Sequence, residues 1–202
     1  MKNTQENIRL KGDYVEEKVT GANSSKKIIA TTRFKQHMEV HLNSFIIPYE
    51  ELINECIQNG RFDKLEKAFE EIIIEFPYNI GISSMVEINQ NDNVFYAKRV
   101  GRDIFTKFVK NREIKIVNKC VICMKQSSSN ADEYFLITMF PGKQTIKEPE
   151  DRNIKNISIL EQTLLFWDQH AIVFEEGTID SLSLTYECPY NHLWRNVGIS
   201  RG

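Results

Sequence analysis

The spacing of apolar residues predicts one strand and two helices in the first part of the chain. Residues 28–42 are rich in β-branched side chains, so we expect a strand on which His37 and His41 share one face. Residues 48–60 carry apolar positions at helical spacing, opened by a proline and ended by a glycine. Residues 63–76 repeat that spacing up to the next proline. The pattern therefore indicates a helical hairpin with a short glycine turn.

The apolar period changes to two from residue 83 onward, which is typical of strands. Residues 85–88 and 94–97 flank a turn-rich spacer and predict a β-hairpin. Residues 114–124 form another expected strand, and residues 134–140 are its expected antiparallel partner. The middle of the chain is therefore expected to form an antiparallel sheet of about four strands.

The two ends of the chain complete the predicted fold. Residues 157–170 predict a late helix, and residues 182–186 a weak strand. The polar residues 1–25 are interpreted as a mobile N-terminal arm, and residues 26–202 as a single domain. The fold class that follows is α+β, with a helical hairpin, then the antiparallel sheet, then the late helix.

Composition sets broad limits on the class of protein. The chain has 202 residues, 41% of them hydrophobic and 27% charged, which suffices for a globular core. No run approaches the roughly 18 apolar residues of a membrane span, and the N-terminus lacks the apolar stretch of a secretory signal. We therefore expect a cytoplasmic protein with no membrane partner, and its four cysteines as reduced thiols.

Residues 96–119 form a basic block within an acidic chain. The block sums to +6, from eight basic and two acidic residues, whereas the whole chain sums to −2. Aromatic residues lie between the charges, and such a pattern is typical of a segment that binds a polyanion, with RNA as the expected partner. An ordinary solvated face of lysines and arginines remains the alternative.

Within this block, the cluster of Lys98, Arg99 and Arg102 around Gly101 is the expected phosphate site. The planar guanidinium of arginine can bind two phosphate oxygens at once, and the same arginines could stabilise a phosphorane without a metal. The residues expected to contact the nucleic acid beyond this cluster are Tyr96, Lys107, Lys110, Arg112 and Lys115.

Two histidines and one threonine are further candidates for the chemistry. On a strand, His37 and His41 would lie about 13 Å apart at roughly 3.3 Å per residue, too far to share one metal ion. Either could act as a general acid or base, and His41 is the preferred candidate. Thr138 lies midway through an apolar strand, where its hydroxyl either bonds a phosphate or satisfies a neighbouring backbone group.

A zinc site is the alternative role for the cysteines. Cys120, Cys123, Cys188 and His192 together offer four ligands. The first two lie three apart on an expected strand, however, and would point to opposite faces of the sheet. Buried apolar thiols are therefore the preferred interpretation, and we expect no metal and no cofactor.

Several motifs resemble, as a set, a bacterial group of small proteins with a "KR-x-GR … FVK-x-R … LIT … G … PEP-x-D" pattern. They lie at residues 96–102, 105–112, 134–138, Gly142 and 148–151. That group resembles the barnase/EndoU/colicin/RelE-like superfamily of metal-independent ribonucleases, many of them toxins. The resemblance implies roles at the scissile phosphate for His41, for the basic residues Lys98, Arg99 and Arg102, and for the hydroxyl of Thr138.

The function expected from sequence is therefore a metal-independent endoribonuclease of toxin or anti-phage type, in which the 2′-OH of RNA attacks the adjacent phosphorus. Its partners would be RNA and an antitoxin or regulatory protein. The alternative is a non-catalytic RNA- or protein-binding regulatory module that uses the basic face of residues 96–119.

Overall fold

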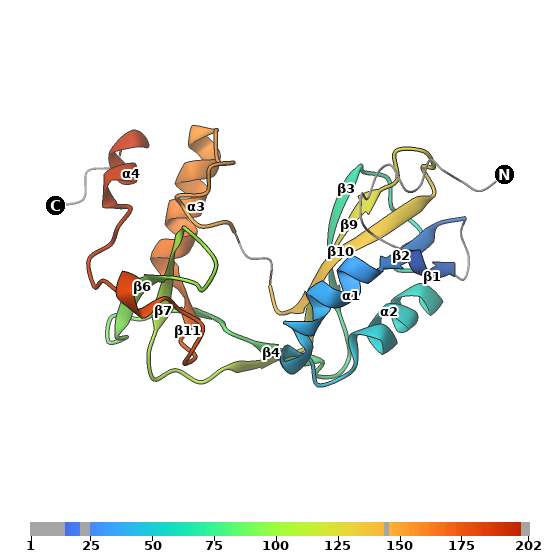
Figure 1. Cartoon of the computed structure of the whole chain (residues 1–202), viewed down its shortest axis with the longest axis horizontal. Coiled ribbons are helices and arrows are strands. Elements are labelled where there is room, and N and C mark those ends of the chain that lie inside the picture. The colour runs from blue at the N-terminus through green and yellow to red at the C-terminus, as the bar shows by residue number, and fades with distance from the viewer. Residues whose placement is uncertain (1–14, 21–24, 144–145, 199–202) are drawn as a thin grey trace. The chain divides into compact units, whose positions relative to one another are not determined.

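The chain gathers into two compact units in a computed structural model that describes residues 15–20, 25–143 and 146–198 (Figure 1). The first unit comprises residues 1–82 and 116–143, and the second comprises residues 83–115 and 144–202. Each unit is built from two segments that are distant in sequence. The single domain expected from residue 26 onward stays a prediction.

The first unit contains a five-stranded sheet of order β1-β2-β10-β9-β3. Its strands are β1 (Val15–Thr20), β2 (Lys27–Thr31), β10 (Glu133–Pro141), β9 (Lys119–Gln126) and β3 (Phe69–Glu75). β10 runs parallel to β2, and the other neighbours are antiparallel. β1 falls within the expected N-terminal arm, and the remainder of that arm lies mostly outside the described residues.

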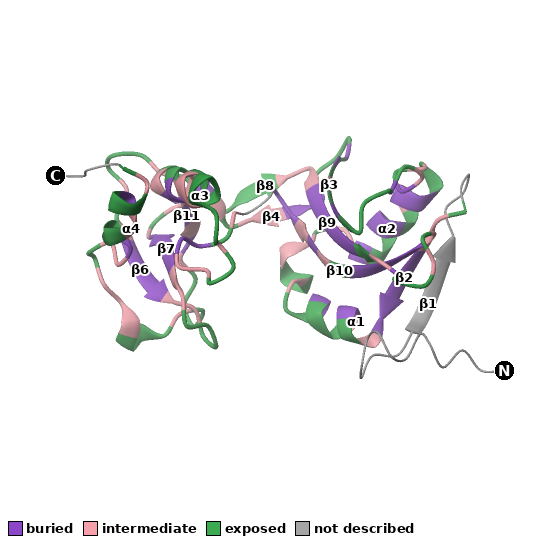
Figure 2. Cartoon of the chain, turned by 90° about the horizontal axis from the view of Figure 1, so that it is seen from above, coloured by how far each residue is buried: buried purple, intermediate pink, exposed green. Residues whose placement is uncertain are grey.

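Two helices, α1 (Thr32–Glu39) and α2 (Tyr49–Gln58), pack with the sheet of the first unit around one core (Figure 2). A 3₁₀ turn, η1 (Leu42–Ser44), lies between them. α1 begins where the hydroxyl of Thr31 accepts a hydrogen bond from the backbone N–H of Phe34. Phe34 and Met38 lie one helical turn apart and are fully buried, which fixes the face that α1 turns to the sheet.

Two sequence predictions for the first unit are wrong in part. The strand expected over residues 28–42 ends at Thr31, because the cap at that residue starts α1. The second helix of the expected hairpin is strand β3. Its three consecutive isoleucines, Ile72 to Ile74, favour extended backbone, and pairing with β9 satisfies that preference.

The second unit contains a four-stranded sheet of order β5-β11-β7-β6. Its strands are β5 (Met85–Glu87), β11 (His170–Val173), β7 (Phe105–Val109) and β6 (Val94–Lys98). The remaining elements there are α3 (Ile157–Gln169), the 3₁₀ turn η2 (Ser181–Ser183) and α4 (Asn191–Asn196). β4 (Gly81–Ser83) and β8 (Lys115–Val117) form a two-stranded sheet. Each of these two strands contains a boundary between the units along the chain.

The α+β class, the late helix and the antiparallel pair of β9 and β10 are confirmed. The hairpin predicted over residues 85–97 is wrong, although both strands form. β5 pairs with β11, and β6 pairs with β7. The weak strand expected at residues 182–186 is a 3₁₀ turn followed by an isolated bridge of Thr185 to Tyr96. Among the described residues, no helix is both long and apolar enough to cross a bilayer.

Candidate functional site

Two histidines and a threonine meet in the first unit. The Nε2 atom of His37 lies 2.9 Å from the hydroxyl oxygen of Thr138, within hydrogen-bond distance. The ring centroids of His37 and His41 are 4.9 Å apart, in an edge-to-face arrangement. The cluster therefore combines two titratable imidazoles with one hydroxyl, and we refer to these three residues as the histidine cluster.

The local fold explains how residues 101 positions apart come together. β2 pairs with β10 only through Glu133 to Phe135, and after Thr31 the chain turns into α1. α1 then packs against β10. A register shift between Leu136 and Thr138 interrupts the pairing of β10 with β9 at this place. Thr138 therefore lies where β10 meets α1.

The sequence interpretation of the two histidines was wrong in geometry. His37 lies in α1 and His41 just after it, so the rings are in contact and do not stand about 13 Å apart as expected for a strand. The ring of His41 contacts that of His37, and it is His37 that lies within hydrogen-bond distance of Thr138, so the catalytic roles expected for His41 and Thr138 stay predictions. Phe34 and Met38 are apolar residues four positions apart in the sequence, and both are buried. This helical spacing is the signal that sequence reasoning missed.

The two imidazoles differ in their surroundings. His37 is exposed, whereas His41 is half-buried. Burial lowers the pKa of His41 below its ordinary value, and the nearby charge of His37 lowers it further. At neutral pH, His41 is therefore held in the neutral form, which can accept a proton.

An exposed arginine lies one helical turn before the exposed histidine. Arg33 and His37 are four residues apart in α1, so their side chains leave the same face of the helix. Sequence reasoning did not single out Arg33, because the segment had been interpreted as a strand. Its fixed positive charge stands beside the histidine cluster on the helix surface.

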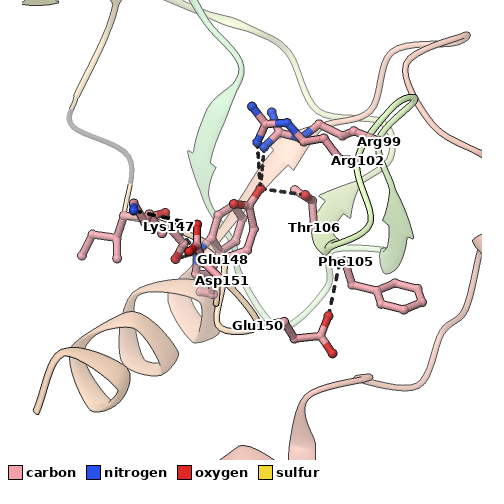
Figure 3. A network of polar contacts seen from close by, with 10 residues as sticks. Arg99, Arg102, Phe105, Thr106, Lys147, Glu148, Glu150 and Asp151 are labelled. Carbon is pink, nitrogen blue, oxygen red and sulfur yellow. Dashed lines mark hydrogen bonds and ion pairs between the residues drawn. The ribbon is translucent and has the colours of Figure 1, made fainter. Parts of the chain in front are cut away.

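The predicted phosphate site belongs to the second unit, where it binds an internal carboxylate (Figure 3). Gly101 takes a positive φ of 76° and turns the chain, so that Arg99 and Arg102 approach the same glutamate. Glu148 is buried and accepts hydrogen bonds from Arg99 and, at 2.9 Å, from the hydroxyl of Thr106. The Nη1 atom of Arg102 lies 3.8 Å from the same carboxylate oxygen.

This contact joins two of the motifs noted in the sequence. Arg99 and Arg102 come from the basic motif, and Glu148 comes from the acidic motif at residues 148–151. The single negative charge of Glu148 offsets one of the two guanidinium charges, so the contact explains the pairing of these motifs and leaves one positive charge, with the side chain of Arg102 55% exposed.

Other residues of the basic block also have internal partners. Lys98 pairs with Asp103, and both carboxylate oxygens of Asp92 accept from Arg112 at 3.1 and 3.2 Å. Lys110 lies 5.1 Å above the ring centroid of Phe95, a cation–π distance. These contacts use the charges within the second unit and weaken the case for a continuous RNA face.

Two members of the predicted RNA face are buried. Lys107 is 4% exposed, and its ammonium donates to the carbonyl oxygens of Trp167 and Asp168 at 3.0 and 2.9 Å. The lysine thereby satisfies carbonyl groups at the C-terminal end of α3. Tyr96 is also buried and packs edge-to-face on Tyr190. Lys115, in contrast, is exposed.

The cysteines of the zinc alternative lie in different units. Cys120 and Cys123 are buried in β9, whereas Cys188 belongs to the second unit. Burial raises the pKa of Cys123 to about 11 and raises the pKa of Cys120 as well, which disfavours the thiolates that bind metals. In the described part of the chain, no three histidine, cysteine, aspartate or glutamate residues are grouped as metal ligands.

The comparisons with known proteins assign no family to this chain. No family model matches it. No curated protein matches it either. A solved structure of a conserved hypothetical protein from Toxoplasma gondii ME49 is similar, with a TM-score of 0.49 and 10% sequence identity over 67% of this chain and 90% of that chain.

Proposed function

We propose that the chain is a metal-independent endoribonuclease whose reacting centre is the histidine cluster of the first unit. The observation that carries this proposal is the contact of two imidazole rings, one of which touches a hydroxyl group. Cleavage of RNA by its own 2′-OH needs one group to take a proton and another to give one. Two adjacent histidines in different environments are suited to divide that work.

His41 would be the general base. Its lowered pKa favours the neutral imidazole, which takes the proton of the 2′-OH as the O2′–P bond forms. His37 would be the general acid, giving a proton to the 5′-oxygen as the P–O5′ bond breaks. The products are then a 2′,3′-cyclic phosphate and a free 5′-OH, and no metal enters the step.

Thr138 and Arg33 would assist this step in different ways. The hydroxyl of Thr138, 2.9 Å from His37, would orient the imidazole toward the leaving oxygen. The guanidinium of Arg33 would compensate the charge that gathers on the phosphorane oxygens. Arg99 and Arg102, which the sequence placed in this role, bind Glu148 in the second unit, so their part in cleavage stays a prediction.

The test is cleavage of total RNA by the purified full chain in EDTA, with analysis of the product ends. His37→Gln and His41→Gln should each lower the cleavage rate roughly 10²–10⁴-fold, because general acid–base catalysis contributes that much. Thr138→Val should cause a smaller loss. The matched control is His192→Gln, since His192 is an exposed histidine of the second unit and should leave the rate unchanged.

Two outcomes would count against the proposal. Full cleavage by both histidine variants would remove the cluster from the reaction, and cleavage that needs a divalent metal would exclude the mechanism. Loss of cleavage in Arg102→Ala with its folding intact would return that arginine to the site. RNA binding without cleavage by the wild type would instead favour the alternative, a regulatory binding module.

The proposal includes a biological setting. A toxin or anti-phage nuclease acts on RNA in the cytoplasm, so wild-type expression should slow growth of the host cell. His41→Gln should relieve that effect. Equal growth with both versions, at equal protein levels, would speak against a toxic role.

A further inference from the structure

Strand β3 forms one edge of the five-stranded sheet in the first unit. The strand order places it next to β9 only, and it is the outermost strand on its side of the sheet (Figure 2). It is seven residues long, from Phe69 to Glu75. An edge strand of this length presents a row of backbone donors and acceptors that another strand can use.

The hydrogen-bond pattern between β3 and β9 identifies which residues of β3 direct their backbone N–H and C=O groups away from β9. The carbonyl of Ala68 accepts from the N–H of Gln126, and the N–H of Phe76 donates to Asn118, both on the β9 side. In an antiparallel pair, residues that bond the neighbour alternate with residues that do not. The backbone groups that face away from β9 are therefore those of Phe69, Glu71, Ile73 and Glu75. In the described part of the chain, no hydrogen bond takes up these groups.

The side chains of the same four residues are exposed and alternate between apolar and acidic. Phe69 and Ile73 are each 52% exposed, and Glu71 and Glu75 are exposed as well. Glu75 pairs with Lys119 of β9 at 3.3 Å, whereas Glu71 has no ion pair with another described residue. They share one face of the sheet because strand residues two apart point the same way. The edge thus combines free backbone groups with a regular pattern of charge and apolar surface.

We propose that the β3 edge binds an extended segment of another protein whose residues alternate between basic and apolar. Such a segment would add a sixth strand through the outward backbone groups. A lysine or arginine would lie opposite Glu71, a second would share Glu75 with Lys119, and the apolar residues would lie opposite Phe69 and Ile73. Thr138 of the histidine cluster lies two strands away from Glu71 in the same sheet, and the inference does not depend on the proposed ribonuclease activity.

Charge argues against the other occupants of this edge. A second copy paired antiparallel about Ile72 would set Glu71 diagonally across from Glu71 of that copy, and parallel pairing in register would set equal carboxylates side by side. Either arrangement brings like charges together. Nucleic acid would meet the same carboxylates with its phosphates. A basic strand is the occupant that the edge attracts.

The test adds a nine-residue synthetic peptide of alternating valine and lysine to the full chain. The amide hydrogen exchange of the chain is then followed by NMR. Binding should slow the exchange of the outward amides of Phe69, Glu71, Ile73 and Glu75. The intervening amides bond β9 already and should change little. Two control peptides have the same length: one carries glutamate in place of lysine, and the other carries the same valines and lysines in two separate blocks. Both should bind at least about fivefold more weakly.

A charge-reversal variant of β3 shows whether the peptide binds at this edge. Glu71→Lys should weaken binding of the lysine peptide at least about fivefold and strengthen that of the glutamate peptide. Glu113→Lys changes the net charge equally at an exposed site of the second unit and should leave both affinities unaltered.

Three results would overturn the inference. The first is no protection of the four outward amides by the lysine peptide while circular dichroism shows the sheet intact. The second is equal binding of the lysine and glutamate peptides. The third is protection of those amides that rises with protein concentration alone, which would assign the edge to a second copy.

Discussion

The carboxylate of Glu148 should stabilise the second unit, because it accepts hydrogen bonds from two side chains and forms an ion pair at 3.8 Å with a third. It is 7% exposed and receives hydrogen bonds from Arg99 and Thr106, with Arg102 nearby. Glu148→Gln keeps the size of the side chain but removes its charge. The guanidinium of Arg99 then loses its ion pair while still partly withdrawn from water.

The size of the effect follows from the exposure of the two partners. Breaking a fully buried ion pair costs about 3–5 kcal/mol, whereas an exposed pair contributes about 0–1 kcal/mol. The side chain of Glu148 is 9% exposed and that of Arg99 is 31% exposed, so water can solvate part of the unpaired charge. We therefore expect the free energy of unfolding of the second unit to fall by about 2 kcal/mol.

Tryptophan fluorescence during urea unfolding measures this unit selectively. The chain has 2 tryptophans, Trp167 and Trp194, and both are buried in the second unit. With a urea dependence of about 1–2 kcal/mol per molar, the midpoint should fall by about 1–2 M. Asp103→Asn is the control, because the pair of Asp103 with Lys98 is largely exposed and its loss should not shift the midpoint measurably.

Unchanged stability of Glu148→Gln would refute the reasoning and show that the arginines do not depend on this carboxylate. A shift in Asp103→Asn as large as that in Glu148→Gln would also contradict it, since burial would then not be the deciding factor. Because Arg99 and Glu148 share one contact, Arg99→Met and Glu148→Gln should be less than additive in the double variant.

Two further predictions follow from other contacts. Lys107→Met should lower the free energy of unfolding of the second unit by about 2 kcal/mol, because two carbonyl groups at the end of α3 lose a charged donor. The same tryptophan fluorescence measures this change. Unchanged stability together with weakened RNA binding would instead restore the predicted role of Lys107 on an RNA face. NMR titration should place the pKa of His41 below its ordinary value of 6.5, and His37→Gln should raise it, because one of its two causes is the charge of His37. The folded first unit then binds fewer protons at His41 than the unfolded chain, so its stability should fall as the pH drops from 6.5 through the folded pKa. A pKa of His41 at or above 6.5 would remove the reason for naming it the general base.

Local patterns in the sequence were sufficient for those elements whose partners lie nearby along the chain. The helical spacing between Pro48 and Gly60 predicted α2, and the apolar stripe after residue 156 predicted α3. β9 and β10 are separated by a short polar loop, so their pairing could also be expected from order alone. In each case the signal and the structure it determines occupy the same stretch of residues.

Only the tertiary structure decided the elements whose partners are remote. Residues 63–76 have an apolar spacing that suits either a helix or a strand, and pairing with β9 resolved the ambiguity for β3. β11 enters the sheet of the second unit between β5 and β7, which separates the two strands expected to form a hairpin. Neither outcome is encoded in the period of the local sequence.

The candidate site shows the same division. From the sequence alone, His41 and Thr138 could be identified as chemically capable residues, and the basic block as a local excess of charge. Tertiary contacts decided that His37 joins them across 101 residues, and that Glu148 lies against Arg99 and Arg102. The physical reason is that Coulomb forces and hydrogen bonds act over a few ångströms in space, irrespective of separation along the chain. A run of charges therefore indicates how much charge is present, and the fold determines which of it remains available to a partner.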